Sequence, residues 1–260
     1  MMQIHSGGPK RPNVHVLGDY GPQAAQMIAD AILTTIAETG RCRIGLAGGR
    51  TPAPVYGQLR ALLPASAYRQ LRVTWTDERV LEKVGHAPGD WQPFDPESNL
   101  RMAYAEWLSK VPIPHENVLP MSLSGDARVE LLRFGKAFRA QFDGGLDIAL
   151  LGLGSDGHVA SLFPGHPALD VDDLALAVHD SPKPPAARIS LTLPVLKRAR
   201  TVIILARGKA KSDVIVRAMA GDAALPVTRF LEHPRAFFLL DSAAARGIVL
   251  AELDAMTPGE

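Results

Sequence analysis

Cysteine and net charge are both scarce in this sequence. Cys42 is the only cysteine among 260 residues, which excludes an internal disulfide and any zinc site built from several thiolates. The 28 Lys and Arg residues nearly balance the 27 Asp and Glu residues, and the net charge is +1 at pH 7. Because no basic excess can attract nucleic acid or anionic lipids, we expect neither nucleic acid nor a membrane as a partner.

Long apolar runs are also missing. No run approaches the ~18 residues that cross a bilayer, and the first residues, MMQIHSGGPKRPNV, lack the apolar core of a signal peptide. We therefore expect a cytoplasmic protein. Hydrophobic residues still make up 47% of the chain and charged residues 21%, which is usual for a globular protein with a substantial core.

The apolar residues that are present follow two alternating patterns. Spacings of three and four residues predict helices, and short continuous apolar runs predict buried strands. The expected helices cover 22–38, 51–63, 98–108, 127–142 and 211–219, with an alanine-rich segment at 241–245. The expected strands cover 41–49, 71–76, 146–154, 201–206 and 236–240. This alternation predicts an α/β fold with a doubly wound, mostly parallel sheet and helices on both faces.

The chain has no internal repeat and no segment long enough to separate two domains. Its Pro- and Gly-rich stretches at 84–96 and 181–186 are short and predict surface loops. We expect a single domain over 1–260, with an N-terminal tail over 1–15 and an extended loop over 80–97.

Glycines and polar residues gather at the ends of four expected strands. The first strand leads into GGRTP (48–52), the second into TDER (76–79), the third into GSDGH (154–158) and the fourth into RGKAK (207–211). In an open parallel sheet the carboxyl ends of the strands lie at one edge, and ligands bind there. We therefore expect these four loops to meet around one site.

The GGRTP turn has the features of a phosphate site. Glycines allow close approach of the backbone, and the helix that follows presents unpaired N–H groups and the positive end of its dipole. Thr51 is its expected N-cap, and Pro52 its first residue. The G-K-[ST] sequence of a nucleoside-triphosphate loop is absent, which favours a monophosphate ester. Lys211 can supply a positive charge to the same group.

The stretch GLGSDG (152–157) matches the dinucleotide-binding pattern G-x-G-x-x-G. Asp156 argues against that function because its charge would repel a pyrophosphate, and the prolines at 164 and 167 would end the required helix within about two turns. We therefore expect no nicotinamide cofactor. The glycines instead turn the chain so that Asp156 and His158 project into the crevice, where an imidazole suits proton transfer near neutral pH.

Taken together, the four loops resemble those of the 6-phosphogluconolactonases. The matching stretches are GLAGGRTPAPVY, TWTDERV with SN at 98–99, LDIALLGLGSDGHVASLFPG, and RISLTLPVL (188–196) with GKAK, in the family's order. The resemblance runs from about residue 20 to 245. It implies a Rossmann-like α/β fold shared with glucosamine-6-phosphate deaminases, hydrolysis of 6-phospho-D-glucono-1,5-lactone in the oxidative pentose phosphate pathway, and no cofactor.

Two positions separate the lactonases from the deaminases of the same superfamily. The deaminase pattern has Asp-Glu-Tyr where Asp77-Glu78-Arg79 stands here, and a glutamate where this chain has Phe163. That glutamate belongs to a proton relay for sugar ring opening, whereas Arg79 supplies a fixed cation beside a developing oxyanion. A deaminase or isomerase is the less favoured alternative. A non-catalytic sugar-phosphate sensor would need a DNA-binding segment, for which the part before the first helix is too short.

One departure from the lactonase pattern lies between Arg79 and Ser98, which are about twice as far apart as in the family. The extra segment includes VGHAPGDWQPFDP, with Trp91 and Phe94. These two aromatic residues either close over the site or pack on the surface, and the sequence does not choose between these placements. If they close over the site, the enzyme could prefer a different lactone from other members of the family.

The resemblance and the strand-end positions together assign roles to ten residues. We expect His158 to act as general base on water, Asp156 to orient it, Arg79 to lie near the reacting carbonyl, and Asp77 to hold Arg79 or contact a sugar hydroxyl. The expected substrate-binding residues are Gly48, Gly49, Arg50, Thr51, Lys211 and Arg188. We expect a small sugar-phosphate lactone as the partner of a monomer or weak homodimer, with no metal.

Overall fold

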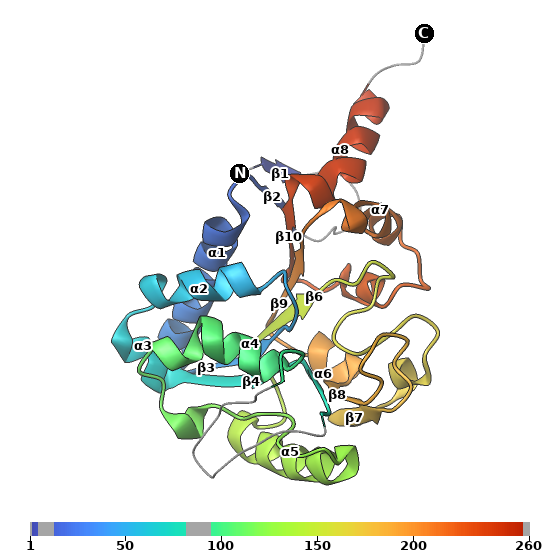
Figure 1. The fold of residues 1–260 in the computed structure, drawn as a ribbon. Coiled ribbons are helices and arrows are strands. Elements are labelled where there is room, and N and C mark those ends of the chain that lie inside the picture. Colours follow the sequence, from blue (N-terminus) through green and yellow to red (C-terminus); the bar gives the residue numbers. More distant parts are fainter. Residues whose placement is uncertain (1, 5–12, 82–94, 257–260) are drawn as a thin grey trace.

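The structure, a computed structural model, describes residues 2–4, 13–81 and 95–256. Its centre is a seven-stranded sheet (Figure 1). In sheet order the strands are β1 (Met2–Ile4), β2 (Asn13–Leu17), β10 (Ala236–Asp241), β9 (Thr201–Ala206), β6 (Ile148–Gly152), β3 (Cys42–Leu46) and β4 (Leu71–Trp75). Every pairing is parallel except that of β1 with β2. The predicted mostly parallel sheet is confirmed.

The central strands are apolar on both faces. All six residues of β9 are buried, and so are the first four residues of β6. A strand that is covered on both faces shows a continuous apolar run instead of alternating polar and apolar residues. This is the pattern that TVIILA and IALLG show in the sequence.

Helices cover both faces of the sheet, as predicted. They are α1 (Tyr20–Thr39), α2 (Ala53–Leu62), α3 (Ala65–Gln70), α4 (Asn99–Glu106), α5 (Ala127–Phe142), α6 (Leu193–Lys197), α7 (Ser212–Met219) and α8 (Ser242–Met256). Short 3₁₀ helices are η1 (Leu108–Lys110), η2 (His115–Asn117), η3 (Pro167–Asp170), η4 (Lys209–Lys211) and η5 (Pro226–Phe230). Figure 1 shows α1 and α2 on one side of the sheet and α7 and α8 on the other.

The strand order explains why the helices divide between the two faces. From β3 the chain moves outward to β4, and it then returns to β6 and continues through β9 to β10 in the opposite direction. Because crossovers between parallel strands are right-handed, this reversal moves the connecting helices to the other face. The reversal point lies between β3 and β6, where open α/β sheets bind ligands.

A second, antiparallel sheet was not expected from the sequence. β5 (Asp77–Arg79) pairs with β8 (Arg188–Leu191), and β8 pairs with β7 (Ala175–Val178). In this register Asp77 lies opposite Ser190 and Arg79 opposite Arg188. The segment TDER is therefore a short strand and not only a loop, and its partner lies too far along the chain for local periodicity to reveal the pairing.

The expected N-terminal tail over 1–15 is wrong. Residues 2–4 and 13–17 form β1 and β2, and β2 pairs with β10 from Asn13 opposite Phe237 to Leu17 opposite Asp241. NVHVL is short and contains a histidine, so its periodicity is weak, and its partner strand lies near the other end of the chain.

The start of α2 also differs from expectation. The helix begins at Ala53 with Pro52 as its N-cap, and no side chain caps it. Thr51 is therefore not the N-cap; it lies in the turn before the helix. Of the expected loop over 80–97, residues 82–94 lie outside the described residues.

Glu78 joins the second sheet to α4. Its buried carboxylate accepts the backbone N–H groups of Asn99 at 2.9 Å, Leu100 at 2.7 Å and Arg79 at 2.8 Å, and the Ser98 hydroxyl at 3.3 Å. Burial raises the pKa of Glu78 to about 7, although the three N–H groups oppose this shift. Both oxygens accept hydrogen bonds, so this side chain links the start of α4 to β5.

We expect Glu78→Gln to destabilise the fold. At pH 8 the carboxylate is ionised, and an amide NH₂ in its place would face a backbone N–H, which costs about 1–3 kcal/mol of unfolding free energy. Urea denaturation at pH 8 measures this loss. Glu116→Gln, at an exposed position, is the control and should change stability by less than about 0.5 kcal/mol. Equal stability of the two variants would contradict the assignment.

Candidate active site

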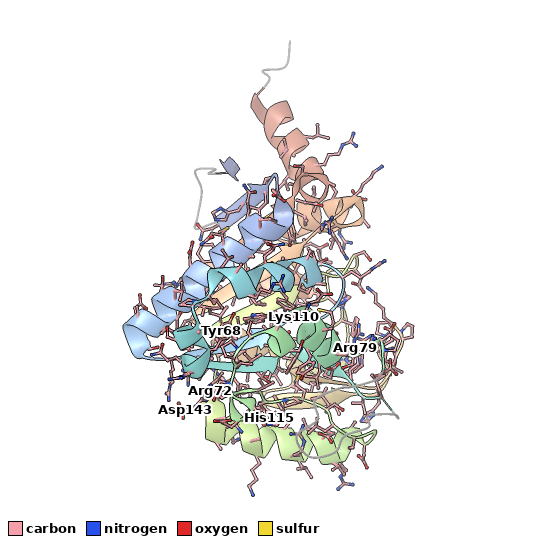
Figure 2. All side chains as sticks on the ribbon, turned by 60° about the vertical axis from the view of Figure 1, so that its left-hand side comes forward. Tyr68, Arg72, Arg79, Lys110, His115 and Asp143 are labelled. Atoms are coloured by element: carbon pink, nitrogen blue, oxygen red, sulfur yellow. The ribbon has the colours of Figure 1, made fainter. Side chains whose placement is uncertain are left out.

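The four strand-end loops meet around a cavity of about 690 Å³. The cavity lies beyond the carboxyl ends of β3, β4, β6 and β9, and the segment 183–188 closes it from the side of the second sheet. Figure 2 shows Arg79 near this edge, with Arg72 and Asp143 toward the opposite edge of the sheet. Of the ten predicted site residues, all except Asp156 line the cavity.

His158 and Asp156 form a hydrogen-bonded pair at the top of the cavity. His158 Nδ1 lies 2.5 Å from Asp156 Oδ1. The pair occupies the space where a side chain of residue 154 would stand, since a Cβ on Gly154 would lie 2.0 Å from His158 Nδ1 and 2.4 Å from Asp156 Oδ1. Gly154 is therefore required by this close approach. Because an ionised carboxylate only accepts, Nδ1 carries the proton and Nε2 is left as the basic nitrogen.

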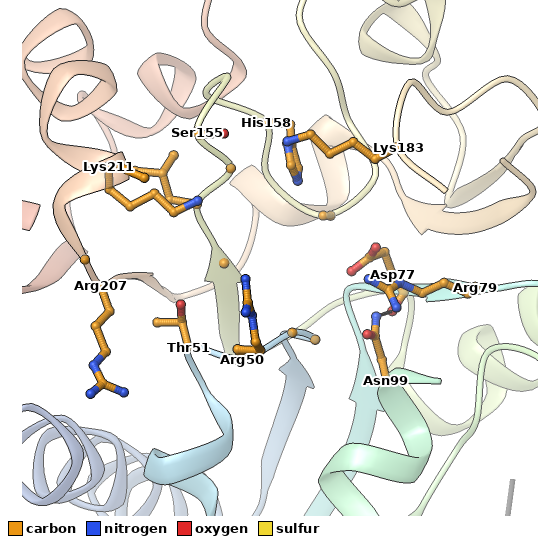
Figure 3. Close-up of a pocket in the computed structure, with 18 of the residues that line it drawn as sticks. Arg50, Thr51, Asp77, Arg79, Asn99, Ser155, His158, Lys183, Arg207 and Lys211 are labelled. Atoms are coloured by element: carbon orange, nitrogen blue, oxygen red, sulfur yellow. Dashed lines mark hydrogen bonds between the residues drawn. The ribbon is translucent and has the colours of Figure 1, made fainter. Parts of the chain in front are cut away.

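Lys183 is a site residue that the sequence did not indicate. Its Nζ lies 3.1 Å from Asp156 Oδ1 and 3.3 Å from His158 Nδ1, and Figure 3 shows it beside the imidazole. Burial raises the pKa of Asp156, but the hydrogen bonds and charges of His158 and Lys183 outweigh burial and lower it well below the usual range. Asp156 is thus a carboxylate at neutral pH and able to orient His158.

Asp77 and Arg79 lie on the opposite wall, at the start and end of β5 (Figure 3). Asp77 accepts the Ser161 hydroxyl at 2.7 Å. Arg79 donates to the backbone carbonyl and carboxylate of Glu97, and its buried Nε has no hydrogen-bond partner among the described residues. Asp77 does not hold Arg79, which was one of its two expected roles. Among the described residues, the cation nearest to the Asp77 carboxylate is Arg188, at 3.9 Å.

Arg188 uses most of its donors on the backbone of the neighbouring loop. It is 4% exposed, its Nε donates to the carbonyl of Pro185 at 3.1 Å, and its Nη2 donates to those of Lys183 and Pro184 at 3.0 and 3.1 Å. Burial lowers its pKa, with Asp77 acting in the opposite direction. Arg188 therefore fixes the loop that carries Lys183, on the Asp77 side of the cavity.

Phe163 packs beside the imidazole. Its ring centroid lies 4.7 Å from that of His158, and the Arg188 guanidinium carbon lies 5.8 Å from the Phe163 centroid. An aromatic ring at this position supplies apolar contact and no proton-transfer group. The proton relay expected of a deaminase therefore has no carboxylate at this position.

The other end of the cavity has the residues expected of an anion site. Gly48, Gly49, Arg50, Thr51 and Lys211 line it, and Figure 3 shows Arg50 and Thr51 across from Lys211. Burial lowers the pKa of Lys211, with the positive charges of Lys183 and Arg50 adding to this effect and Asp156 opposing it. A half-buried ammonium beside other cations favours a bound anion that compensates its charge.

Positive charge dominates the cavity wall. The wall carries six basic side chains, Arg50, Arg79, Lys183, Arg188, Arg207 and Lys211, and one acidic side chain, Asp77. Arg207 was not predicted, although it directly follows β9 and the strand-end argument covers it. In a chain with a net charge of +1, this concentration of cations predicts an anionic ligand.

The glycines of 152–157 do not lead into a helix. After Gly157 the chain forms turns, and the next helical segment is η3 at Pro167–Asp170. A dinucleotide motif needs a helix N-terminus directly after its glycines, so this part of the chain lacks that feature. Within the described ranges no group of three His, Cys, Asp or Glu side chains could hold a metal ion, and none of the helices there is long and apolar enough to span a bilayer.

The fold and the site define the chain as an α/β protein with a histidine–carboxylate pair beside a cationic pocket. The family model of glucosamine-6-phosphate isomerases and 6-phosphogluconolactonases matches residues 19–238. The chain belongs to this family.

Similar proteins carry the name of one branch of the family. The chain is 37% identical to a 6-phosphogluconolactonase of Synechocystis over 77% of its length and 81% of that protein. It is 34% identical to the human 6-phosphogluconolactonase over 88% and 89% of the two chains. The crystal structure of the 6-phosphogluconolactonase from Thermotoga maritima superposes with a TM-score of 0.77 and 25% identity, covering 88% of this chain and 98% of that one.

We expect Gly48→Ala to disturb the cavity wall through Asn99. An added Cβ would lie 1.8 Å from Asn99 Oδ1, while Asn99 Nδ2 donates to the Asp77 carbonyl at 2.9 Å. The overpacking should cost about 1–3 kcal/mol of unfolding free energy. Gly18→Ala, whose Cβ would meet no atom within 4 Å, should change stability by less than about 0.5 kcal/mol.

The double variant Gly48→Ala/Asn99→Ala completes this test. Removing the amide removes the clash, so the loss in the double variant should be smaller than the sum of the two single losses by about 0.5 kcal/mol or more. Strict additivity in urea denaturation would show that Asn99 does not fill the space above Gly48.

Proposed function

We propose that this chain hydrolyses 6-phospho-D-glucono-1,5-lactone to 6-phospho-D-gluconate, the lactonase step of the oxidative pentose phosphate pathway. The relatives named 6-phosphogluconolactonase support this activity over most of the chain. The observation that carries the proposal is the His158–Asp156 pair at one side of a pocket whose other side is lined by Arg50, Lys211 and the glycines of the 48–51 turn. A substrate that carries both an ester carbonyl and a phosphate needs a base near the carbonyl and positive charge near the phosphate.

His158 acts as the general base in this proposal. Asp156 accepts Nδ1–H and orients the ring, so Nε2 takes a proton from water as the water oxygen bonds to the lactone C1. The carbonyl electrons move to the exocyclic oxygen, where Arg79 stabilises the negative charge. When the carbonyl re-forms, the bond from C1 to the ring oxygen breaks, and that oxygen takes the proton back from His158.

The phosphate anchors the substrate at the other end of the pocket. Gly48, Gly49 and Thr51 precede the N-terminus of α2, whose dipole favours an anion. Arg50 and Lys211 add positive charge from the two sides. Holding the phosphate fixes the lactone ring relative to His158, and such positioning contributes to the rate because the reactants no longer need to find one another.

We propose modified roles for two of the predicted residues. Arg188 positions Lys183 through the loop carbonyls rather than binding the phosphate. Asp77, which accepts from Ser161, is placed to contact a sugar hydroxyl rather than to hold Arg79. Lys183 joins the catalytic group as the cation that shares the Asp156 carboxylate.

A deaminase or isomerase activity is less well supported by the same site. Phe163 lies against His158 where the deaminase pattern needs a carboxylate.

The proposal also includes a free small-molecule lactone as partner, a monomer or weak homodimer, and a cytoplasmic location.

We expect His158→Asn to lower kcat by about 10²–10⁴, the usual contribution of general-base catalysis. The product, 6-phosphogluconate, should still bind with similar affinity, because the phosphate end of the pocket is unchanged. Lactone hydrolysis with the spontaneous rate subtracted measures kcat, and calorimetry measures product binding. His179→Asn, at an exposed position, is the control. If the variant kept more than about a tenth of the wild-type kcat, the base would have to be Asp77 or Asp156.

We expect Lys211→Met to raise KM for the phosphorylated lactone far more than KM for plain gluconolactone. Lys211 is half-buried and lines the pocket, whereas Lys209 on the same turn is exposed and does not. Lys209→Met is therefore the matched control and should leave the ratio of the two KM values near that of the wild type. Equal changes on both substrates would remove Lys211 from the phosphate site.

A further inference from the structure

Asp241 is a partly buried carboxylate at the end of β10 that belongs to no group described so far. Its Oδ1 and Oδ2 accept the backbone N–H of Gly208 at 3.0 and 3.1 Å. Its Oδ1 also accepts the N–H of Ala244 at 2.7 Å. Ala244 lies in the first turn of α8, where backbone donors lack a helical partner. Asp241 therefore caps α8 and binds the loop after β9 at the same time.

The sheet register places Asp241 beside this loop. Leu240 of β10 pairs with Ala206 of β9, so the next residue of each strand, Asp241 and Arg207, are neighbours beyond the last pair. Arg207 Nε lies 3.9 Å from Asp241 Oδ2. In Figure 3 the Arg207 guanidinium is directed away from Lys211.

Gly208 in turn determines where Lys211 lies. Gly208 has φ of +93°, a left-handed conformation that glycine adopts without strain. It is the N-cap of η4, and its carbonyl accepts the N–H of Lys211 at 3.0 Å. Gly208 and Lys211 both line the pocket. A displacement of the Gly208 peptide would therefore move the Lys211 backbone with it.

We propose that Asp241 is a positioning residue for the phosphate end of the pocket: by fixing the Gly208 N–H, it sets Lys211 opposite the 48–51 turn. This inference rests on the proposed function only in identifying the anion as the phosphate of the substrate.

In this proposal Asp241 acts through the geometry of its hydrogen bonds and not through its charge. A carboxylate near an anion site opposes anion binding by its own charge. The charges that act on Lys211 come from Lys183, Asp156 and Arg50. Capping α8 alone would need only the bond to Ala244, which serine supplies as well as aspartate does. The bond to Gly208 is the part that a simple cap does not explain.

Two substitutions separate these effects. Asp241→Asn keeps the oxygen at the Oδ1 position, which accepts from Gly208 at 3.0 Å and from Ala244 at 2.7 Å. It removes the charge and the second, 3.1 Å contact of Oδ2 with Gly208. Asp241→Ser keeps a cap for α8, but its shorter side chain cannot reach both N–H groups. The matched control is Asp126→Ser, which makes the same change at the cap of α5, where Asp126 accepts the N–H groups of Arg128 and Val129.

The measured quantity is the ratio of kcat/KM for the phosphorylated lactone to kcat/KM for plain gluconolactone. We expect this ratio to fall about tenfold in Asp241→Ser, the scale of one hydrogen bond to a charged group. It should stay within about threefold of wild type in Asp241→Asn and in Asp126→Ser. A general loss of stability would lower both activities and leave the ratio unchanged.

Two results would overturn the proposal. One is a wild-type ratio in Asp241→Ser, and the other is an equal fall in Asp241→Asn, which would make charge the cause. If Asp241→Ser does not fold, amide hydrogen exchange of Gly208 in the wild-type protein decides the question. We expect that amide to be protected, and exchange at the rate of an open turn would contradict its bond to Asp241.

The phosphate site can also be tested without lactonase activity. At a given concentration of inorganic phosphate the rise in Tm should be smaller for Asp241→Ser than for the wild type, and the same as wild type for Asp126→Ser. If the wild type does not hydrolyse the lactone but this shift is seen, the proposed function fails and the positioning role stands. If the wild type is active and neither the ratio nor the phosphate binding changes, only the positioning role fails.

Discussion

The parallel pairing of β6 between β3 and β9 is the constraint on which the site depends. This pairing brings the ends of three strands to one edge, with Leu46, Gly152 and Ala206 as the last residues of β3, β6 and β9. The loops that follow carry the 48–51 turn, the His158–Asp156 pair and Lys211. Each of these groups lies within six residues of the last residue of its strand, so its side chains stay near the edge that the strands define. The cavity lies at the position between β3 and β6, where the chain reverses direction and open α/β sheets bind ligands.

Positive charges are concentrated at this edge of the sheet, and their mutual repulsion costs free energy when no ligand is bound. Burial lowers the pKa of both Lys211 and Arg188, which means that the protein disfavours their charged forms relative to water. Asp77 offsets part of this cost for Arg188, and an anionic ligand at the other end of the cavity would offset it for Lys211. The same argument explains why the Asp156 carboxylate is tolerated: it is hydrogen-bonded to His158 and supplies a counter-charge to Lys183.

Ionisable side chains that bind backbone groups hold the parts of the site together. Glu78 binds the N–H groups at the start of α4, Arg188 binds three carbonyls of the 183–185 segment, and Asp241 binds the N–H of Gly208. Hydrogen bonds to charged groups are stronger than those between neutral groups. Each of these residues fixes a neighbouring segment that carries a pocket residue, so the pocket's geometry depends on groups that need not touch the ligand.

The sequence by itself determined the α/β class, the central strands and the loops that meet at their ends. These features follow from local apolar runs, from glycines and from the rule that parallel strands share one carboxyl edge. His158, Asp156, Lys211 and the 48–51 turn could be placed in this way because each directly follows a strand. Only the tertiary structure decided the contact of Lys183 with Asp156, the contact of Asp241 with Gly208, and the second sheet that pairs β5 with β8 and places Arg188 opposite Arg79. Those positions depend on contacts between segments far apart in the chain, and residue spacing within one segment carries no information about such contacts.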